Sequence, residues 1–427
     1  MWKISLGEGL KSGLTDLCNG RFPVGLFYFD KALWTDAGVR QASETGADFF
    51  VSVESSPELL SLCEKFDLGV FSVSNITPVW WGGDGKNAGG YREATPLGKL
   101  YEVKDNYPDS QVLWGDYIVD EPNSVDFAHI GKVVKLYKEL FPGKIPLINL
   151  YPCYASMPSN THDEVIMQLG NSDYTEHIDQ YIQEIDLPYI CFDYYPFTGV
   201  FADYLENLRV IAAACKNSGK EMWVIIQSGA WSKEQILEEF QLDWQVYICL
   251  AFGVSSITYA SYSKGWWDEE TSCVNLKGEK NVTFEYVKGI NSVLHSDFGT
   301  EILKYDYLYT GVHGDIDSSD DRIKSQLMRL RRSEIPSLPE IDITSDKSVV
   351  AGYFTKGDAF AVLVVNSHDP FDSAVTANVR LETGGMRKAT VFGGSKIEGS
   401  TETAGDITIV GLTIEGGQGA LVTLQTG

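Results

Sequence analysis

The chain has 427 residues, of which 44% are hydrophobic and 22% charged, and its formal net charge is −25 at pH 7. This length suits a large domain followed by a smaller one, and this balance excludes a disordered chain. An acidic surface repels phosphate groups and anionic lipids, so we expect neither nucleic acid nor a membrane as a partner.

The N-terminus and the cysteines both indicate a cytoplasmic protein. Residues 1–8 contain no apolar run long enough for a signal peptide, and no stretch of the sequence is apolar enough to span a bilayer. The seven cysteines are scattered and never form a CxxC pair, which is the usage of reduced, buried thiols. A secreted chain with its signal removed would show the same pattern.

Eight short apolar runs alternate with helical patterns along the first 300 residues. The runs are Phe22–Phe29, Phe49–Val53, Leu68–Ser74, Val112–Val119, Ile145–Leu150, Tyr189–Tyr194, Met222–Gln227 and Ser256–Ser261. The helical segments include Pro57–Lys65, Val125–Phe141, Asp173–Glu184, Phe201–Asn217 and Lys233–Cys249. Strands that are apolar throughout belong to a parallel sheet covered on both faces. The pattern predicts a (β/α)8 TIM barrel over residues 1–300; the alternative, a doubly wound sheet, lacks a GxGxxG or P-loop motif.

The pattern changes after residue 300, where short, often alternating runs are separated by Gly, Asp and Ser. These runs are Val349–Phe354, Ala359–Asn366, Ser373–Leu381, Arg387–Val391, Ile407–Leu412 and Gly419–Thr423. They predict a C-terminal antiparallel β-sandwich domain over residues 301–427. The charged stretch Asp315–Arg332 is expected to be a connecting loop or helix.

Polar residues end the predicted barrel strands, where functional groups of TIM barrels lie. They are Asp30, Glu54, Asn75, Asp120 with Glu121, Asn149, Asp193, Gln227 and Tyr262. The adjacent acids Asp120 and Glu121 stand out because Pro122 stops the strand directly after them. Glycoside hydrolysis needs two carboxyl groups, one of which protonates the leaving oxygen. Alternatively, one of the two acids caps the next helix, which Asn123 or Ser124 could do equally well.

The run Asp120-Glu121-Pro122 resembles the Asn-Glu-Pro motif that ends strand four of clan A glycoside hydrolases, with Asp in place of Asn. The chain also resembles β-galactosidase-like barrel glycosidases in Ile148–Pro152, Phe192–Pro196, a strand ending in Gln227, and Ala251–Gly253. This resemblance covers residues 20–300. It implies a glycosidase with Glu121 as general acid/base and a β domain as a common companion.

The chain departs from clan A at strand seven, because the clan's nucleophile is a Glu where this strand ends in Gln227. Asp193, at the end of the sixth run, is the best substitute as nucleophile or base; alternatively, it is a buried acid bonded to tyrosine hydroxyls. Asp120, Asp30 and Glu54 follow as candidates for the second carboxylate. In a regular strand Asp120 would point away from Glu121.

Loop aromatics are the candidates for stacking on sugar rings. They are Trp80 and Trp81 after strand three, Trp231 after strand seven, and Tyr262 and Trp266 after strand eight. Packing under long loops is the alternative for about half of them. Asn149 and Gln227 suit recognition of hydroxyl groups, and Asp120, Asp30 and Glu54 could also contact the substrate.

The remaining signals predict neither a metal site nor a cofactor. The six histidines are isolated, none ends a predicted barrel strand, and no HExxH or GxSxG motif occurs. The acidic run Asp315–Asp321 lacks the Gly and Glu of an EF-hand loop and is interpreted as solvated. We therefore expect a glycoside hydrolase acting on a small oligosaccharide or glycoside. The alternatives are a non-catalytic carbohydrate-binding protein and a barrel enzyme of another class.

Overall fold

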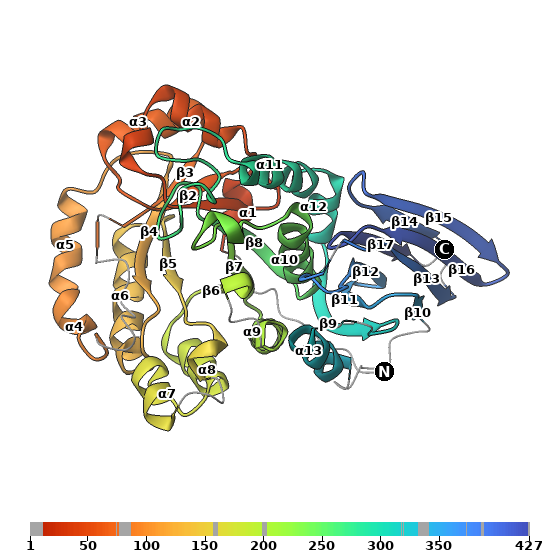
Figure 1. The fold of residues 1–427 in the computed structure, drawn as a ribbon. Helices are drawn as coiled ribbons and strands as arrows, with labels where there is room; N and C mark the ends of the chain where they lie inside the picture. The colour runs from red at the N-terminus through yellow and green to blue at the C-terminus, as the bar shows by residue number, and fades with distance from the viewer. Residues whose placement is uncertain are drawn as a thin grey trace.

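A computed structural model describes residues 12–73, 75–76, 87–156, 161–198, 203–316, 318, 320–331, 341–372, 374–385 and 388–425. Figure 1 shows a barrel of strands wrapped by helices, with antiparallel sheets beside it. The predicted fold class, a TIM barrel followed by a β-sandwich, is confirmed.

Eight parallel strands form the barrel in the order β5-β4-β3-β2-β1-β8-β7-β6. Their bounds are β1 (Val24–Phe27), β2 (Phe49–Val53), β3 (Gly69–Ser72), β4 (Leu113–Asp120), β5 (Ile145–Asn149), β6 (Tyr189–Tyr194), β7 (Glu221–Gln227) and β8 (Val254–Ala260). The two ends of this series meet at a parallel bridge between Leu150 and Phe192. There the N–H of Leu150 donates to the carbonyl of Cys191 at 2.9 Å. The barrel therefore closes between β5 and β6.

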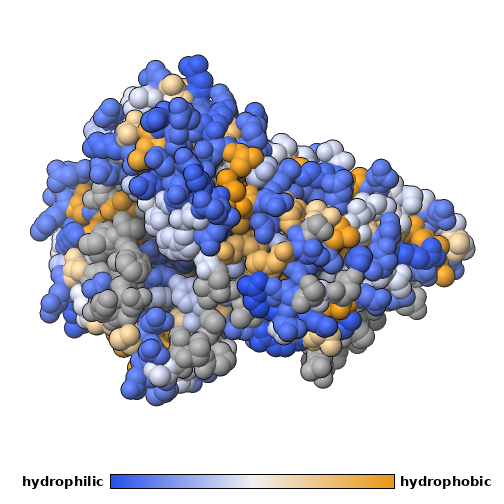
Figure 2. All heavy atoms as spheres, in the orientation of Figure 1, coloured by the Kyte–Doolittle hydropathy of each residue, from blue (hydrophilic) through white to orange (hydrophobic). Residues whose placement is uncertain are grey.

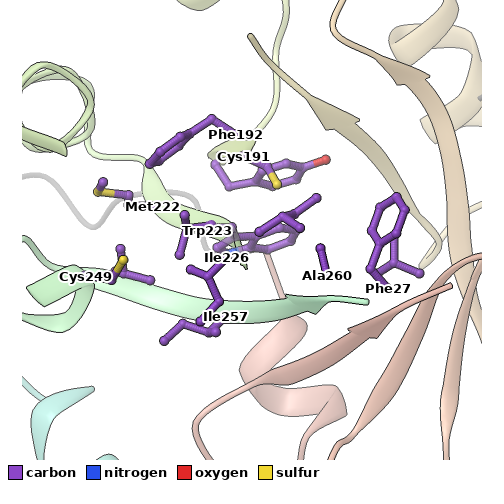
Figure 3. Close-up of a cluster of buried hydrophobic side chains, with 14 of the residues drawn as sticks. Phe27, Cys191, Phe192, Met222, Trp223, Ile226, Cys249, Ile257 and Ala260 are labelled. Carbon is purple, nitrogen blue, oxygen red and sulfur yellow. The ribbon is translucent and has the colours of Figure 1, made fainter. Parts of the chain in front are cut away.

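Side chains fill the barrel interior. In Figure 3, Phe27, Cys191, Trp223 and Ala260 come from β1, β6, β7 and β8 and lie among other buried apolar groups. The ring of Tyr189 stacks on that of Trp223, with 3.7 Å between centroids. Because the interior is a packed core and not a channel, a ligand has access to the barrel at its ends.

Helices surround the barrel. They are α1 (Leu14–Leu17), α2 (Asp36–Ser43), α3 (Pro57–Phe66), α4 (Tyr91–Ala94), α5 (Leu97–Asp105), α6 (Phe127–Leu140), α7 (His162–Leu169), α8 (Tyr174–Glu184), α9 (Tyr204–Ser218), α10 (Glu239–Ala251), α11 (Val282–Leu294) and α12 (Asp297–Ile302). Side chains cap several of these helices at the N-terminus, such as Thr35 at α2 and Ser56 at α3. The segment predicted from Lys233 is divided into a short 3-10 turn, η7 (Lys233–Gln235), and α10. The division follows from a capping box in which Glu238 and Gln241 bond each other's backbone, which starts a new helix.

The C-terminal region forms two antiparallel sheets. One has the order β10-β13-β16-β15 and the other β14-β17-β12-β11-β9. The elements are β9 (Asp306–His313), α13 (Asp321–Arg331), β10 (Ile341–Ser345), β11 (Val349–Lys356), β12 (Ala359–Asn366), β13 (Ala377–Gly384), β14 (Lys388–Phe392), β15 (Ile397–Ala404), β16 (Ile407–Ile414) and β17 (Gly419–Gln425). The sequence did not predict β9, β10 and β15. The domain boundary near residue 300 stays a prediction.

The five-stranded sheet is covered on both faces. Along β11, Val349 and Ala351 contribute to the core between the two sheets, whereas Val350 and Phe354 belong to the core shared with the barrel. The barrel side is provided by α10, which is buried all round and contacts β11 and β12. Gly352 permits this close approach, since a Cβ atom there would lie 2.2 Å from the carbonyl oxygen of Ala251. The two regions are therefore joined by an extensive apolar contact.

On the face drawn in Figure 2, hydrophilic residues cover most of the surface and apolar residues form small groups. None of the helices in the described parts of the chain combines the length and the apolar character needed to cross a membrane.

Candidate functional site

Glu121 occupies a strained position at the end of β4. The strand ends at Asp120, and Glu121 follows with φ = 48°, in the left-handed region that residues other than glycine rarely adopt. Its N–H donates to the carbonyl of Asn149 at 2.8 Å, and its side chain is buried. Strain of this kind costs about 1–3 kcal/mol and clusters at functional sites. Regular strand geometry therefore ends at Asp120, and the expectation that Asp120 and Glu121 point to opposite faces does not apply to Glu121.

Asn149, at the end of β5, holds two carboxylates together. Its Nδ2 donates to Oδ1 of Asp120 at 2.9 Å and to Oδ1 of Asp193 at 2.7 Å. Asp120 ends β4 and Asp193 lies in β6, so one amide group spans three adjacent strands. Both amide hydrogens are used and the residue is buried. Asn149 thus organises the acids, and its predicted contact with substrate hydroxyls stays a prediction.

The two aspartates bind protons more tightly than free aspartates do. Burial and, second to it, the negative charge of Asp193 raise the pKa of Asp120 to about 7, although the hydrogen bond from Asn149 acts to lower it. The pKa of Asp193 is raised to about 6, because burial outweighs the hydrogen bonds from Asn149 and Tyr195 that act to lower it. Near neutral pH the pair therefore exchanges protons readily, which suits general acid–base chemistry.

Two tyrosine side chains accompany these acids, Tyr154 at Glu121 and Tyr195 at Asp193. Tyr154, in the loop after β5, donates to Oε1 of Glu121 at 3.4 Å. Burial raises the pKa of Tyr195 well above 10, and the negative charges of Asp193, Asp120 and Glu121 raise it further. The backbone carbonyl of Asn149 binds the N–H of Glu121 and its side-chain amide binds Asp120 and Asp193, so the three acids share one end of the barrel.

The sequence reasoning did not assign these tyrosines. Tyr195 could have been found, because it lies in the run Asp193–Pro196 and the alternative role given to Asp193 was a hydrogen bond to tyrosine hydroxyls. Tyr154 gave no such signal, because it reaches Glu121 only through the conformation of the turn at Cys153–Ser156.

Gln227, at the end of β7, connects two loops. Its Oε1 accepts the N–H of Phe197 at 2.8 Å, and its Nε2 donates to the carbonyl of Gly229 at 2.9 Å. The backbone of Gln227 is bonded in both directions to the side chain of Gln245 on α10. With 1% of its surface exposed, Gln227 positions the loops after β6 and β7 and does not reach a ligand in this conformation. The second carboxylate is not at this strand end.

The aromatic candidates divide into exposed and buried rings. Trp231 is 56% exposed and packs at 4.6 Å on buried Trp267; Trp266 is 39% exposed and lies 5.9 Å from Tyr195. Tyr262 is 1% exposed and packs on Phe29 and Phe50, so it belongs to the core instead of the surface that its prediction required. Trp80 and Trp81 lie outside the described residues. Trp266 therefore lies near the acids, because its neighbour Tyr195 is hydrogen-bonded to Asp193.

Asp30 and Glu54 lie at the ends of β1 and β2, away from the shared amide group. Asp30 caps the turn η1 (Lys31–Leu33) by accepting the N–H of Ala32 at 2.8 Å. Glu54 is exposed and lies 3.6 Å from the ammonium group of Lys31. Their roles as substrate contacts stay predictions.

A further buried acid, Asp116, lies within β4. It accepts hydrogen bonds from the hydroxyls of Tyr107 and Tyr137, each at 2.6 Å, and from Nδ2 of Asn75 at 2.7 Å. Burial raises the pKa of Asp116, and these three hydrogen bonds lower it. Asp116 thus joins β4 to α6 and to the β3 loop and is a structural acid. Among the described residues, no group of three or more His, Cys, Asp or Glu could hold a metal ion.

Comparisons with known proteins give similarity in structure alone. No family model matches the chain, and no curated protein matches it. An intracellular xylanase from Thermoanaerobacterium saccharolyticum is 12% identical, with a TM-score of 0.42, over 66% of this chain and 99% of that one. The catalytic module of a family 98 glycoside hydrolase from Streptococcus pneumoniae is 8% identical, with a TM-score of 0.41, over 95% of this chain and 98% of that one. Likeness at this level does not define a reaction, so the site has to be judged from its own residues.

Proposed function

We propose that this protein is a glycoside hydrolase in which Glu121 is the general acid/base and Asp193 the nucleophile or base. The observation that carries the proposal is the amide group of Asn149, which binds Asp120 and Asp193 while its backbone carbonyl accepts the N–H of Glu121. Three acids from two strand ends are thus fixed around one residue. Holding buried acids side by side costs folding free energy, and proteins retain such arrangements mainly at functional sites.

The chemistry follows from these positions. Glu121, in its protonated form, gives its proton to the glycosidic oxygen as the bond to the anomeric carbon breaks. Asp193, as carboxylate, either attacks that carbon or removes a proton from an attacking water molecule. In the first case water then cleaves the ester and returns a proton to Glu121. The amide of Asn149 holds Asp120 beside Asp193, and Tyr154 orients Glu121.

Aryl glycosides and oligosaccharides distinguish the role of Glu121 as general acid from that of Asp193 as nucleophile or base. In Glu121→Gln we expect kcat on an oligosaccharide to fall by about 10²–10⁴, with a smaller loss on a dinitrophenyl glycoside, because that leaving group needs no proton. Asp193→Asn should lose both activities. Glu139→Gln is the matched control, since Glu139 is an exposed acid on the outer helix α6. Full activity of Glu121→Gln on the oligosaccharide would end the assignment.

A second candidate function is carbohydrate binding without catalysis. It is favoured by Gln227, which stands where clan A enzymes have their nucleophile and uses its amide for loop contacts. This candidate predicts binding of an oligosaccharide, measured by calorimetry, with no reducing ends released after prolonged incubation. Release of reducing ends that depends on Glu121 excludes it.

A further inference from the structure

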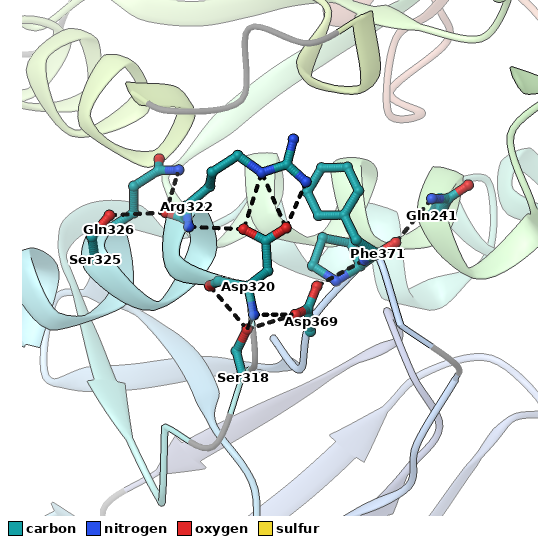
Figure 4. Close-up of polar contacts among 9 residues, drawn as sticks. Gln241, Ser318, Asp320, Arg322, Ser325, Gln326, Asp369 and Phe371 are labelled. Carbon is teal, nitrogen blue, oxygen red and sulfur yellow. Dashed lines mark hydrogen bonds and ion pairs between the residues drawn. The ribbon is translucent and has the colours of Figure 1, made fainter.

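A loop of the C-terminal region reaches the mouth of the barrel. It follows β12, and its Pro370 carbonyl accepts a hydrogen bond from Nε2 of Gln241, near the start of α10, at 2.9 Å (Figure 4). The next residue, Phe371, lies 5.4 Å from the ring of Phe197, edge to face. Phe197 is in the turn η5 (Pro196–Thr198) directly after β6, and its N–H is bound to Gln227. Phe371 therefore lies beside the loops that frame the three acids.

Polar contacts fix this loop to the segment that precedes α13. The buried carboxylate of Asp369 accepts hydrogen bonds from the hydroxyl of Ser318 at 2.6 Å and from the N–H groups of Asp320 and Phe371 at 3.2 and 2.8 Å. Figure 4 shows these bonds joining the loop to the segment that precedes α13. The position of Phe371 is thus set by several independent contacts.

A cation covers one side of the Phe371 ring. The guanidinium group of Arg322 lies 4.1 Å from its centroid, within cation–π range. Arg322 is itself held by Asp320, with Nε 3.0 Å from each carboxylate oxygen. The ring thus has a fixed orientation.

Phe371 nevertheless stays 36% exposed. Burying apolar surface stabilises a protein by about 25 cal/mol for each Å². If Phe371 served only to join the two regions, we would therefore expect its ring to be buried. A rigid, exposed aromatic ring beside a catalytic mouth is what stacking on the apolar face of a sugar requires. Trp231 and Trp266 are exposed on the β7 and β8 side of the same mouth.

We propose that Phe371 stacks on a distal sugar residue of an oligosaccharide whose reacting bond lies between Glu121 and Asp193. This assignment rests on the proposed function and narrows its substrate class from glycosides in general to oligosaccharides of several residues. The C-terminal region then contributes a specificity-determining residue to the site in the barrel.

The test compares substrate lengths in the full-length protein. Cello-, xylo- and manno-oligosaccharides, from disaccharide to hexasaccharide, are assayed beside their monosaccharide aryl glycosides. In Phe371→Ala we expect kcat/KM for the preferred long substrate to fall about tenfold, with the aryl monosaccharide unchanged. Phe371→Trp should restore the preference for length. Tyr101→Ala, an exposed aromatic on α5 at the edge of the molecule opposite the antiparallel sheets, is the control (Figure 1).

The outcomes separate this assignment from the proposed function. Equal losses on long and short substrates, or a lower Tm with unchanged length preference, overturn the role of Phe371 while hydrolysis stands. If none of these substrates is cleaved, calorimetric titration with the same oligosaccharides replaces the assay. Weaker binding of the long ones by Phe371→Ala, but not by Tyr101→Ala, then supports the stacking role although hydrolysis fails. Equal binding by the wild type and Phe371→Ala, or no binding by either, overturns it.

Discussion

Two groups of buried acids, both involving β4, differ in the hydrogen-bond donors that surround their carboxylates. Asp116 accepts three side-chain hydrogen bonds, two of them from tyrosine hydroxyls, on the side of β4 that faces α6. Asp120 and Asp193 instead share the amide group of Asn149 and repel each other. Asp116 therefore has three donors to itself and, among the described residues, no acidic neighbour that shifts its pKa, whereas Asp120 and Asp193 share one amide group and lie within reach of each other's charge. This difference predicts which substitutions damage folding and which damage activity.

The largest effect is expected from Asp193→Asn. The amide has nearly the shape of the carboxylate but can neither attack an anomeric carbon nor accept a proton from water. We expect kcat to fall by about 10³ or more on the substrate identified in the glycoside screen, with an unchanged circular dichroism spectrum. Activity within tenfold of the wild type would place the second carboxylate elsewhere.

The converse substitution is Asp116→Ala. It leaves two tyrosine hydroxyls and the amide of Asn75 without their acceptor, so we expect a loss of about 3 kcal/mol in the free energy of unfolding. Urea denaturation measures this loss. At a temperature where the variant is folded, its kcat should equal that of the wild type. A large fall in kcat would show that the two groups of acids act together.

The third prediction concerns pH. Because the folded protein binds the protons of Asp120 and Asp193 more tightly than the unfolded chain does, their contribution to stability is present at low pH. It is lost as pH rises from about 4 to about 7. At pH 8 the wild type must keep Asp120 ionised in a buried position, which destabilises the fold. Asp120→Asn removes this buried charge and should raise Tm at pH 8 by about 2 °C or more relative to the wild type. Differential scanning fluorimetry at pH 4 and pH 8 measures the difference; a variant less stable at pH 8 contradicts the proposed charge repulsion.

The smallest effect is expected from Tyr107→Phe, which removes one of the three donors to Asp116. The remaining hydrogen bonds still satisfy the carboxylate, so we expect a loss of about 1 kcal/mol in the free energy of unfolding. Tyr154→Phe, compared in the same assay, should change kcat and leave stability nearly constant. The reverse pattern would exchange the roles given to these two tyrosines.

The fold was predictable from the sequence where burial dictates composition. Barrel strands such as β2 and β6 are apolar except for Ser52 and Asp193, because helices and the core cover both of their faces. By contrast β15, with the sequence IEGSTETA, is an exposed edge strand and has no hydrophobic alternation to read. Its strand conformation is set by pairing with β16, which a local pattern does not encode.

The site was predictable to the level of strand ends. Glu121 and Asp193 follow from barrel geometry, which brings the C-terminal ends of all strands to one mouth. The roles of Asn149 and Gln227 were not predictable, because which group an amide binds depends on distances between different strands. The same holds for Phe371, which comes to the mouth from a region far along the chain.

The seam between β5 and β6 gives the acid site a mechanical role. Among the described residues these strands pair through the isolated bridge of Leu150 with Phe192, and the hydrogen bond from Asn149 to Asp193 lies directly beside it. One hydrogen bond therefore holds Asp193, the proposed nucleophile or base, and lies where β5 and β6 join. A ligand that binds Asp193 acts on a residue next to the bridge between β5 and β6. We therefore expect the hydrogen-exchange rate of the Leu150 amide, which is bonded to the carbonyl of Cys191, to differ between the free and the ligand-bound protein.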